Sequence, residues 1–190
     1  IFVLTNSRAL SAQETERLHE ILAENISQAA KRANRDFLLV SRSDSTLRGH
    51  FPLETEILRE VLEKKTLRKI DGEILCPFFQ EGGRYTAEDT HYLVEKGKLV
   101  PVGETEFAKD LTFKSSNLKS WVEEKTHGEY RAEHVLSITL EQLRSSDSGS
   151  ILHTLCSAHD FQKIVVNAIS YQDLAAFVPI LYEAIEHGKR

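Results

Sequence analysis

The feature that most constrains the fold is a repeated order of short apolar run, polar loop and amphipathic helix. Apolar runs at residues 1–4, 37–40 and 73–77 each lead into a polar loop. Helical patterns follow the first two loops, and a capping box of Ser11 and Glu14 opens the first helix. This order predicts parallel strands joined by helices, and therefore an α/β fold.

The second half of the chain returns to the same order after an excursion. Residues 90–110 carry two short strand-like stretches and predict a hairpin-like insertion. Strands are then predicted at residues 135–138 and 163–168, and a last helix over residues 171–187. We expect one domain over residues 1–190, an open and mostly parallel sheet with helices on both faces. This is a three-layer αβα arrangement of the Rossmann-like type.

Composition argues against several classes of function. The 190 residues are 41% hydrophobic and 28% charged with a net charge of −5, and they contain no long basic run. These values argue against nucleic acid or a membrane surface as partner and leave small molecules. Cys76 and Cys156 lie far apart, which predicts neither a disulfide framework nor a metal site. With no signal peptide or membrane span visible, we expect a cytoplasmic protein.

Common catalytic and nucleotide-binding motifs are missing from the sequence. It contains no G-x-G-x-x-G, no G-x-x-x-x-G-K-[ST], no G-x-S-x-G and no H-E-x-x-H. We therefore predict no metal ligand and no cofactor-binding residue in this chain.

The most polar stretch of the chain is Ser41–His50, which lies between a predicted strand and a predicted helix. It holds Arg42 and Arg48 around the carboxylate of Asp44 and the hydroxyls of Ser43, Ser45 and Thr46. At the carboxyl ends of parallel strands such a loop favours an oxygen-rich anionic ligand, which arginine binds in a bidentate manner. The alternative is that these are ordinary turn and cap residues with solvated arginines.

Arginines occur in the loops after all three of the first predicted strands. These are Arg8, then Arg42 with Arg48, and finally Arg84, which follows the Gly82–Gly83 pair. Because loops after parallel strands meet at one sheet edge, four arginines are predicted to face one crevice. The glycine pair is either a flexible turn or a place where backbone N–H groups approach a ligand.

Several of these segments together resemble one known family. The segments are Leu4–Leu10, Ser41–Gly49, Pro77–Phe79 with Glu81–Arg84, and Glu104–Ala108, and the stretch Asp44–Gly49 is the most specific. Together they resemble the N-terminal, sugar-binding domain of the four-carbon acid sugar kinases. The likeness covers nearly the whole chain.

The resemblance implies ATP-dependent phosphorylation of the terminal hydroxyl of threonate, erythronate or a 3-oxo-tetronate. It also implies that ATP and Mg²⁺ bind mainly on a C-terminal domain, the expected partner of this one. The chain opens on Ile1 and has no methionine, and the family's acidic first strand is missing from it. We therefore expect a part of a longer kinase that is inactive alone. A homodimer is left open, and a non-catalytic module that binds a small carboxylic acid is the alternative function.

The resemblance also implies roles for individual residues. Arg48 and Arg84 would hold the substrate carboxylate, and Asp44 would orient or deprotonate the acceptor hydroxyl, with the family's missing N-terminal acids as competing bases. Other hydroxyls of the sugar would meet Ser7, Ser45 and the backbone at Gly49. The predicted substrate-binding set is Ser7, Arg8, Arg42, Asp44, Ser45, Thr46, Arg48, Gly49, Gly83 and Arg84.

Overall fold

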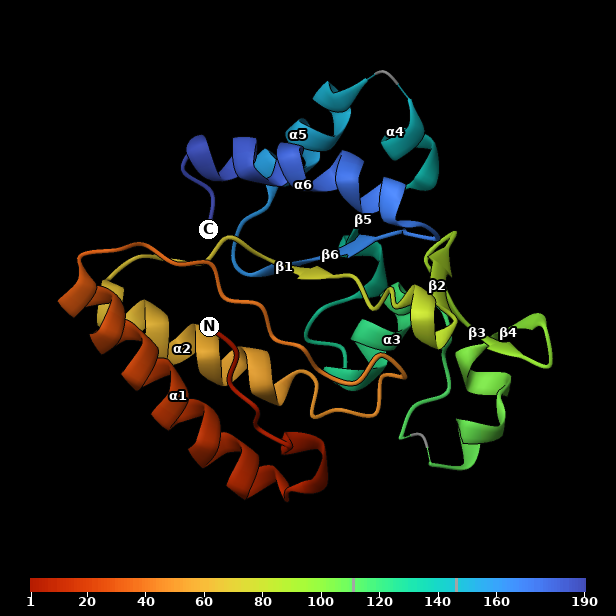
Figure 1. Cartoon of the computed structure of the whole chain (residues 1–190), viewed down its shortest axis with the longest axis horizontal. Coiled ribbons are helices and arrows are strands. Elements are labelled where there is room, and N and C mark those ends of the chain that lie inside the picture. Colours follow the sequence, from red (N-terminus) through yellow and green to blue (C-terminus); the bar gives the residue numbers. More distant parts are fainter. Residues whose placement is uncertain (111, 146) are drawn as a thin grey trace. The chain divides into compact units, whose positions relative to one another are not determined.

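The computed structural model describes residues 1–110, 112–145 and 147–190. The chain divides into two compact units, Ile1–Lys69 and Ile70–Arg190 (Figure 1). Each unit is described by itself.

The first unit is built on two helices, α1 (Ala12–Ala33) and α2 (Leu53–Thr66), which pack against each other. The Ser11 hydroxyl accepts from the backbone N–H of Glu14, and the Glu14 carboxylate accepts from the backbone N–H of Ser11, as the capping box predicts. A short 3-10 helix, η1 (Ser7–Ala9), precedes α1. Both predicted helices are confirmed.

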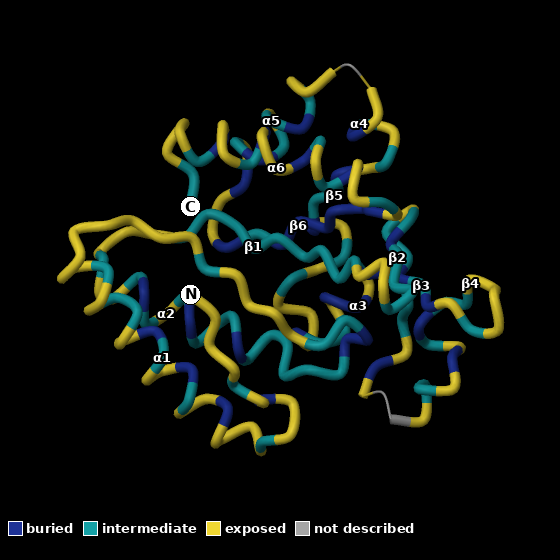
Figure 2. The backbone as a smooth tube through the Cα atoms, in the orientation of Figure 1, coloured by how far each residue is buried: buried dark blue, intermediate teal, exposed yellow. Residues whose placement is uncertain are grey.

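The two strands predicted in this unit are wrong. Residues 1–4 and 37–40 form no strand and pair with no strand of the described chain. Phe2 is 91% exposed and Val40 69% exposed, and Figure 2 draws the first residues as exposed. A four-residue apolar run has the local preference for extended backbone, but a strand is stable only when a neighbouring strand satisfies its hydrogen bonds.

The second unit contains the parallel sheet that the sequence predicts. Its strands are β1 (Gly72–Leu75), β5 (Leu136–Ile138) and β6 (Gln162–Val166). They lie in the order β1-β6-β5, and β6 pairs in parallel with both neighbours. The predicted strands at residues 73–77, 135–138 and 163–168 are therefore confirmed.

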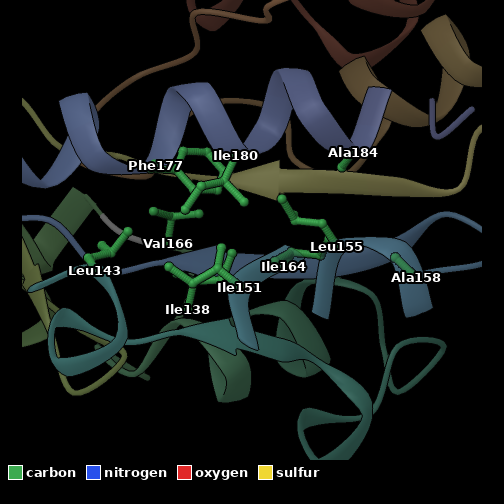
Figure 3. Packing of buried hydrophobic residues seen from close by; sticks show 10 residues of the cluster. All are labelled: Ile138, Leu143, Ile151, Leu155, Ala158, Ile164, Val166, Phe177, Ile180 and Ala184. Atoms are coloured by element: carbon green, nitrogen blue, oxygen red, sulfur yellow. The ribbon is translucent and has the colours of Figure 1, made fainter. Parts of the chain in front are cut away.

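Helices cover both faces of this sheet. On one face lie α4 (Leu140–Arg144), α5 (Ser148–Ser157) and α6 (Tyr171–Glu186), while α3 (Leu118–Lys125) packs against β6 on the other (Figure 1). Alternate side chains of β6 point to the two layers, as the period of a strand requires. The predicted α/β class with three layers is confirmed. Figure 3 shows the main core, formed by Ile138, Leu143, Ile151, Leu155, Ala158, Ile164, Val166, Phe177, Ile180 and Ala184.

The predicted insertion is present as a small antiparallel sheet. Its strands are β2 (Arg84–Ala87), β3 (Thr90–Glu95) and β4 (Lys98–Pro101), in that order. The sequence predicts the β3–β4 hairpin but not β2, because the glycines before it are typical of a loop. Arg84 therefore lies on a strand and not in a loop. Short 3-10 helices complete the unit: η2 (Gln80–Gly82), η3 (Val102–Glu104), η4 (Glu106–Asp110) and η5 (Ala132–His134).

Among the described residues, none of the helices combines the length and the apolar character needed to cross a membrane.

The two cysteines differ in their surroundings. Cys76 follows β1 and packs against the core, and its burial raises the pKa of the Cys76 thiol to about 11. At pH 8 only about a thousandth of such a thiol is ionised, and the thiolate is the reactive form. We predict that Cys76, in a Cys156→Ser variant, reacts with a disulfide reagent at least about a hundredfold more slowly than in the unfolded chain.

The control is the same Cys156→Ser variant in denaturant, which exposes the Cys76 thiol to solvent. The Cys76→Ser variant reports on Cys156, which lies 4.0 Å from the Nδ1 atom of His187. Equal rates for Cys76 in folded and unfolded chains would show that its thiol is not protected.

Candidate functional site

The Ser41–His50 stretch contains a tight turn, and part of it is buried. The backbone N–H of Leu47 donates to the carbonyl of Asp44 at 2.8 Å, and Leu47 has a φ of 62°. Thr46 is 1% exposed and Leu47 8% exposed. Burial of these two residues fixes the backbone that carries Asp44 and Arg48.

Asp44 is the centre of an ion cluster. Arg48 approaches its carboxylate with two N–H groups, Nε at 2.7 Å from Oδ2 and Nη2 at 3.3 Å from Oδ1. Arg8 lies in η1, and its Nη1 atom is 3.4 Å from Asp44 Oδ1. The hydroxyl of Thr46 also donates to Asp44. The structure thus brings together four residues of the predicted set: Arg8, Asp44, Thr46 and Arg48.

The carboxylate of Asp44 is held in its ionised form. Partial burial opposes ionisation, but hydrogen bonds from Arg48 and Thr46 and the charge of Arg48 outweigh it and hold the pKa of Asp44 below its ordinary value. Two guanidinium groups around one carboxylate leave a net charge of +1 on the cluster. Such a cluster favours a monovalent anion as ligand.

The two arginines of the cluster present different surfaces. The side chain of Arg48 is 25% exposed and that of Arg8 is 55% exposed. The Nε and Nη2 edge of Arg48 faces Asp44, although we expected Arg48 to hold a substrate carboxylate. Arg8 is therefore the arginine of the cluster with the more exposed side chain.

The remaining predicted residues of the first unit lie close to these in the chain. Ser7 is buried, and its hydroxyl accepts from Thr5 Oγ1 at 3.2 Å. Gly49 allows a close approach, because a Cβ atom there would lie 2.0 Å from Ser43 Oγ. Arg42 is exposed and Ser45 is half-buried.

Sequence reasoning missed two residues that hold these loops in place. Thr5 contacts Ser7, and His50 Nε2 lies 2.9 Å from the carbonyl oxygen of Leu10, which joins the turn before α2 to the loop before α1. A histidine directly after the Asp44–Gly49 motif was the available signal.

Gly83 and Arg84 lie in the second unit. Gly83 has a φ of 69°, and a Cβ atom at Gly82 would lie 2.5 Å from the ring of Phe79 and 2.8 Å from Nη1 of Arg84. The glycine pair is therefore needed for packing and for a left-handed backbone. Arg84 Nη1 donates to the carbonyl of Gly82, while its buried Nε has no hydrogen-bond partner within the described residues. That Arg84 joins the arginines of the first unit stays a prediction.

Sequence reasoning also missed Tyr171, which holds the loop before Arg84. Its hydroxyl lies 2.7 Å from each carboxylate oxygen of Glu81, and its ring packs edge-on against Phe78 at 5.3 Å. The hydrogen bond lowers the pKa of Glu81 and raises the pKa of Tyr171. The signal was the position of Tyr171 in the segment after the carboxyl end of a parallel strand.

Over the described ranges, the structure brings no three His, Cys, Asp or Glu side chains together as a metal site would need.

Comparison with protein families supplies the deciding observation. A family model described as a sugar-binding N-terminal domain matches residues 1–190. The chain belongs to this family. It is the domain of four-carbon acid sugar kinases, as the resemblance implied. A search of curated proteins finds no match to the chain. The sugar-binding domain carries the Asp44 cluster in its first unit and Arg84 in its second.

The lowered pKa of Asp44 makes stability depend on pH. A carboxylate with a depressed pKa in the folded state stabilises the fold above its unfolded pKa of about 3.9, and this contribution is lost as pH falls through the folded pKa. We predict that Asp44→Asn lowers the free energy of unfolding by about 1–3 kcal/mol at pH 7, because Arg48 and Thr46 lose a charged partner. The difference from wild type should shrink as pH falls below about 4.

Urea denaturation at several pH values measures this effect. Asp36→Asn is the control, because Asp36 is an exposed carboxylate in the same unit. It should change the free energy of unfolding by less than about 0.5 kcal/mol. A constant difference between Asp44→Asn and wild type from pH 7 to pH 3 would contradict the assignment.

Proposed function

We propose that this sugar-binding domain is the acceptor-binding part of a kinase that phosphorylates the terminal hydroxyl of a four-carbon acid sugar. The substrate class is that of threonate, erythronate and 3-oxo-tetronate. The observation that carries the proposal is the net positive cluster of Arg8, Asp44 and Arg48 beside hydroxyl-bearing residues. Membership of a sugar-binding family supports a ligand with several hydroxyls, and the positive cluster supports a carboxylate on that ligand.

In this proposal Arg8 binds the carboxylate of the acid sugar. Its side chain is more exposed than that of Arg48, and a guanidinium matches the two oxygens of a carboxylate. Arg48 holds Asp44 in place and adds positive charge to the cluster. Arg42 in the same unit is a further candidate for this anion. Arg84 is a candidate substrate-binding residue of the second unit, and it carries a buried Nε with no hydrogen-bond partner in the described part of the chain.

Asp44 is proposed to act on the acceptor hydroxyl. It is ionised at neutral pH because its pKa is lowered, so it can accept a hydrogen bond from that hydroxyl and orient it. Phosphoryl transfer has a loose transition state, and positioning the nucleophile contributes more than removing its proton. Ser7, Ser45, Thr46 and the backbone at Gly49 would contact or shape the remainder of the sugar.

The resemblance also implies ATP and magnesium. Within the described ranges no three carboxylate, histidine or thiol groups come together, and the sequence has no phosphate-binding loop. We therefore assign no residue of this chain to the nucleotide or its metal. These groups would be supplied by an ATP-binding domain that follows this one.

Binding of the acid sugar tests the first part of the proposal. We predict that Arg8→Ala and Arg8→Lys each weaken the binding of threonate or erythronate by about 10- to 100-fold, because a hydrogen-bonded charge pair contributes about 1.5–3 kcal/mol. Lysine keeps the charge but not the two-pronged geometry. Titration calorimetry with the purified chain measures the dissociation constants.

Two controls sharpen this experiment. Arg17→Lys changes an exposed arginine on α1 in the same unit and should leave the affinity unchanged. Threitol and erythritol have the hydroxyls but no carboxylate, and they should bind at least about tenfold more weakly than the acids. Equal affinity for acid and polyol, or an unchanged dissociation constant in Arg8→Ala, would rule out Arg8 as the anion site.

Turnover tests the second part. In a longer protein that joins this chain to its ATP-binding domain, Asp44→Asn should lower kcat by about 10² to 10⁴ with a smaller effect on KM. Steady-state kinetics with threonate and ATP measure both constants. If the wild-type protein binds the acid but transfers no phosphate, the non-catalytic binding module is the correct function.

A further inference from the structure

The turn between β2 and β3 has a left-handed backbone at both of its central residues. Ala87 pairs with Thr90, so the loop consists of Glu88 and Asp89 alone. Their φ values are 50° and 57°, both in the left-handed region, as in a two-residue type I′ turn. Glycine, asparagine and aspartate adopt this conformation most readily, and the contacts of the Asp89 side chain stabilise it further.

Asp89 makes such contacts with β5, with α3 and with the residue that follows β6. Its backbone N–H donates to Asn167 Oδ1 at 2.8 Å, and its Oδ1 accepts from Asn167 Nδ2 at 2.8 Å. The same oxygen accepts from Ser137 Oγ on β5 at 2.5 Å. Lys119 Nζ on α3 lies 3.5 Å from Oδ2. One side chain thus joins the hairpin to β5, α3 and the residue after β6.

Asn167 is the matching group on the sheet. It follows β6 directly and is 1% exposed. Besides its two hydrogen bonds with Asp89, it donates to the carbonyl of Ile138, the last residue of β5, at 3.0 Å. The amide is therefore held at the carboxyl edge of the parallel sheet, and Asp89 is held by the amide.

These contacts determine where the strand of Arg84 lies. The backbone N–H of Thr86, two residues after Arg84, donates to the carbonyl of Ala168 at 3.0 Å. At the other end, Glu81 accepts from Tyr171. Residues 168–171 therefore contact β2 at Thr86 and the preceding helix η2 at Glu81, and Asp89 anchors the end of β2 nearer the hairpin turn.

We propose that Asp89 is a positioning residue that fixes β2, and with it Arg84, at the carboxyl edge of the parallel sheet. Its importance for ligand binding rests on the proposed function, in which Arg84 is a candidate substrate-binding residue. Asp89 itself is not assigned to the ligand, and its carboxylate contacts Ser137, Asn167 and Lys119.

Amide hydrogen exchange tests the positioning role without any ligand. In Asp89→Ala, the amide of Thr86 should exchange at least about tenfold faster than in wild type, while the amides of Ile164 and Val165 in β6 keep their rates. Asp89→Asn should restore most of the protection, because an asparagine oxygen can accept from Ser137 and Asn167 and asparagine tolerates the left-handed backbone.

Asp160→Asn is the matched control. Asp160 has a φ of 53° in another turn of the same unit, but its side chain is 91% exposed. This substitution should leave exchange at Thr86 unchanged. If Asp89→Ala does not fold, Ser137→Ala removes a single donor and should raise exchange at Thr86 by a smaller factor.

Binding separates a positioning role from a loss of overall stability. Asp89→Ala and Arg84→Lys should each raise the dissociation constant for threonate. The double variant should have a dissociation constant no higher than the higher value of the two single variants. Additive losses of affinity would overturn the coupling of Asp89 to Arg84. Unchanged exchange at Thr86 in Asp89→Ala would overturn the positioning role, whereas absence of acid-sugar binding by the wild-type chain would overturn the proposed function alone.

Discussion

The second unit depends on the pairing of β6 with a strand on each side. Because β1 and β5 both pair with β6, the backbone N–H and C=O groups of β6 have hydrogen-bond partners on both sides. Helices cover the two faces of the sheet, as is usual for parallel strands. Ile164 and Val166 enter the main core on one face. The segment that leaves β6 can then carry buried polar groups, such as Asn167, whose hydrogen bonds depend on a fixed strand end.

The same central strand buries a charge. Lys163 is 0% exposed, and its ammonium lies 2.6 Å from Glu73 Oε2 on β1. It also lies over the rings of Tyr130 at 4.2 Å and Phe161 at 3.7 Å from their centroids. A buried lysine requires such partners, because moving an ammonium ion out of water costs several kcal/mol of hydration free energy. The carboxylate of Glu73 and the two aromatic rings offset this cost. The pairing of β1 with β6 brings the two charges together.

In the first unit an ion cluster joins two segments that are distant in sequence. Asp44 and Arg8 are 36 residues apart, and their contact joins the loop before α1 to the turn before α2. The cluster combines two features that a site for an acid sugar needs, a net positive charge and an ionised acceptor beside hydroxyls. A positively charged surface built in this way is preorganised, because Arg48 is already held by Asp44 and Thr46 is buried.

Much of this protein can be predicted from the sequence alone. Capping residues and apolar periodicity predict the helices, the strands of the parallel sheet and the insertion, and the Asp44–Gly49 motif indicates the family. These features depend on neighbours in the sequence, so local patterns reveal them. Residues 1–4 and 37–40 have equally apolar patterns but form no strand, since a strand requires a partner that the local pattern cannot supply.

The tertiary structure alone decided that Arg48 turns to Asp44, that Arg84 lies on a strand, and that Asp89 meets Asn167. Arg48 and Asp44 lie in one turn, and their pairing depends on how that turn folds. Asp89 and Asn167 lie 78 positions apart, where sequence periodicity carries no information.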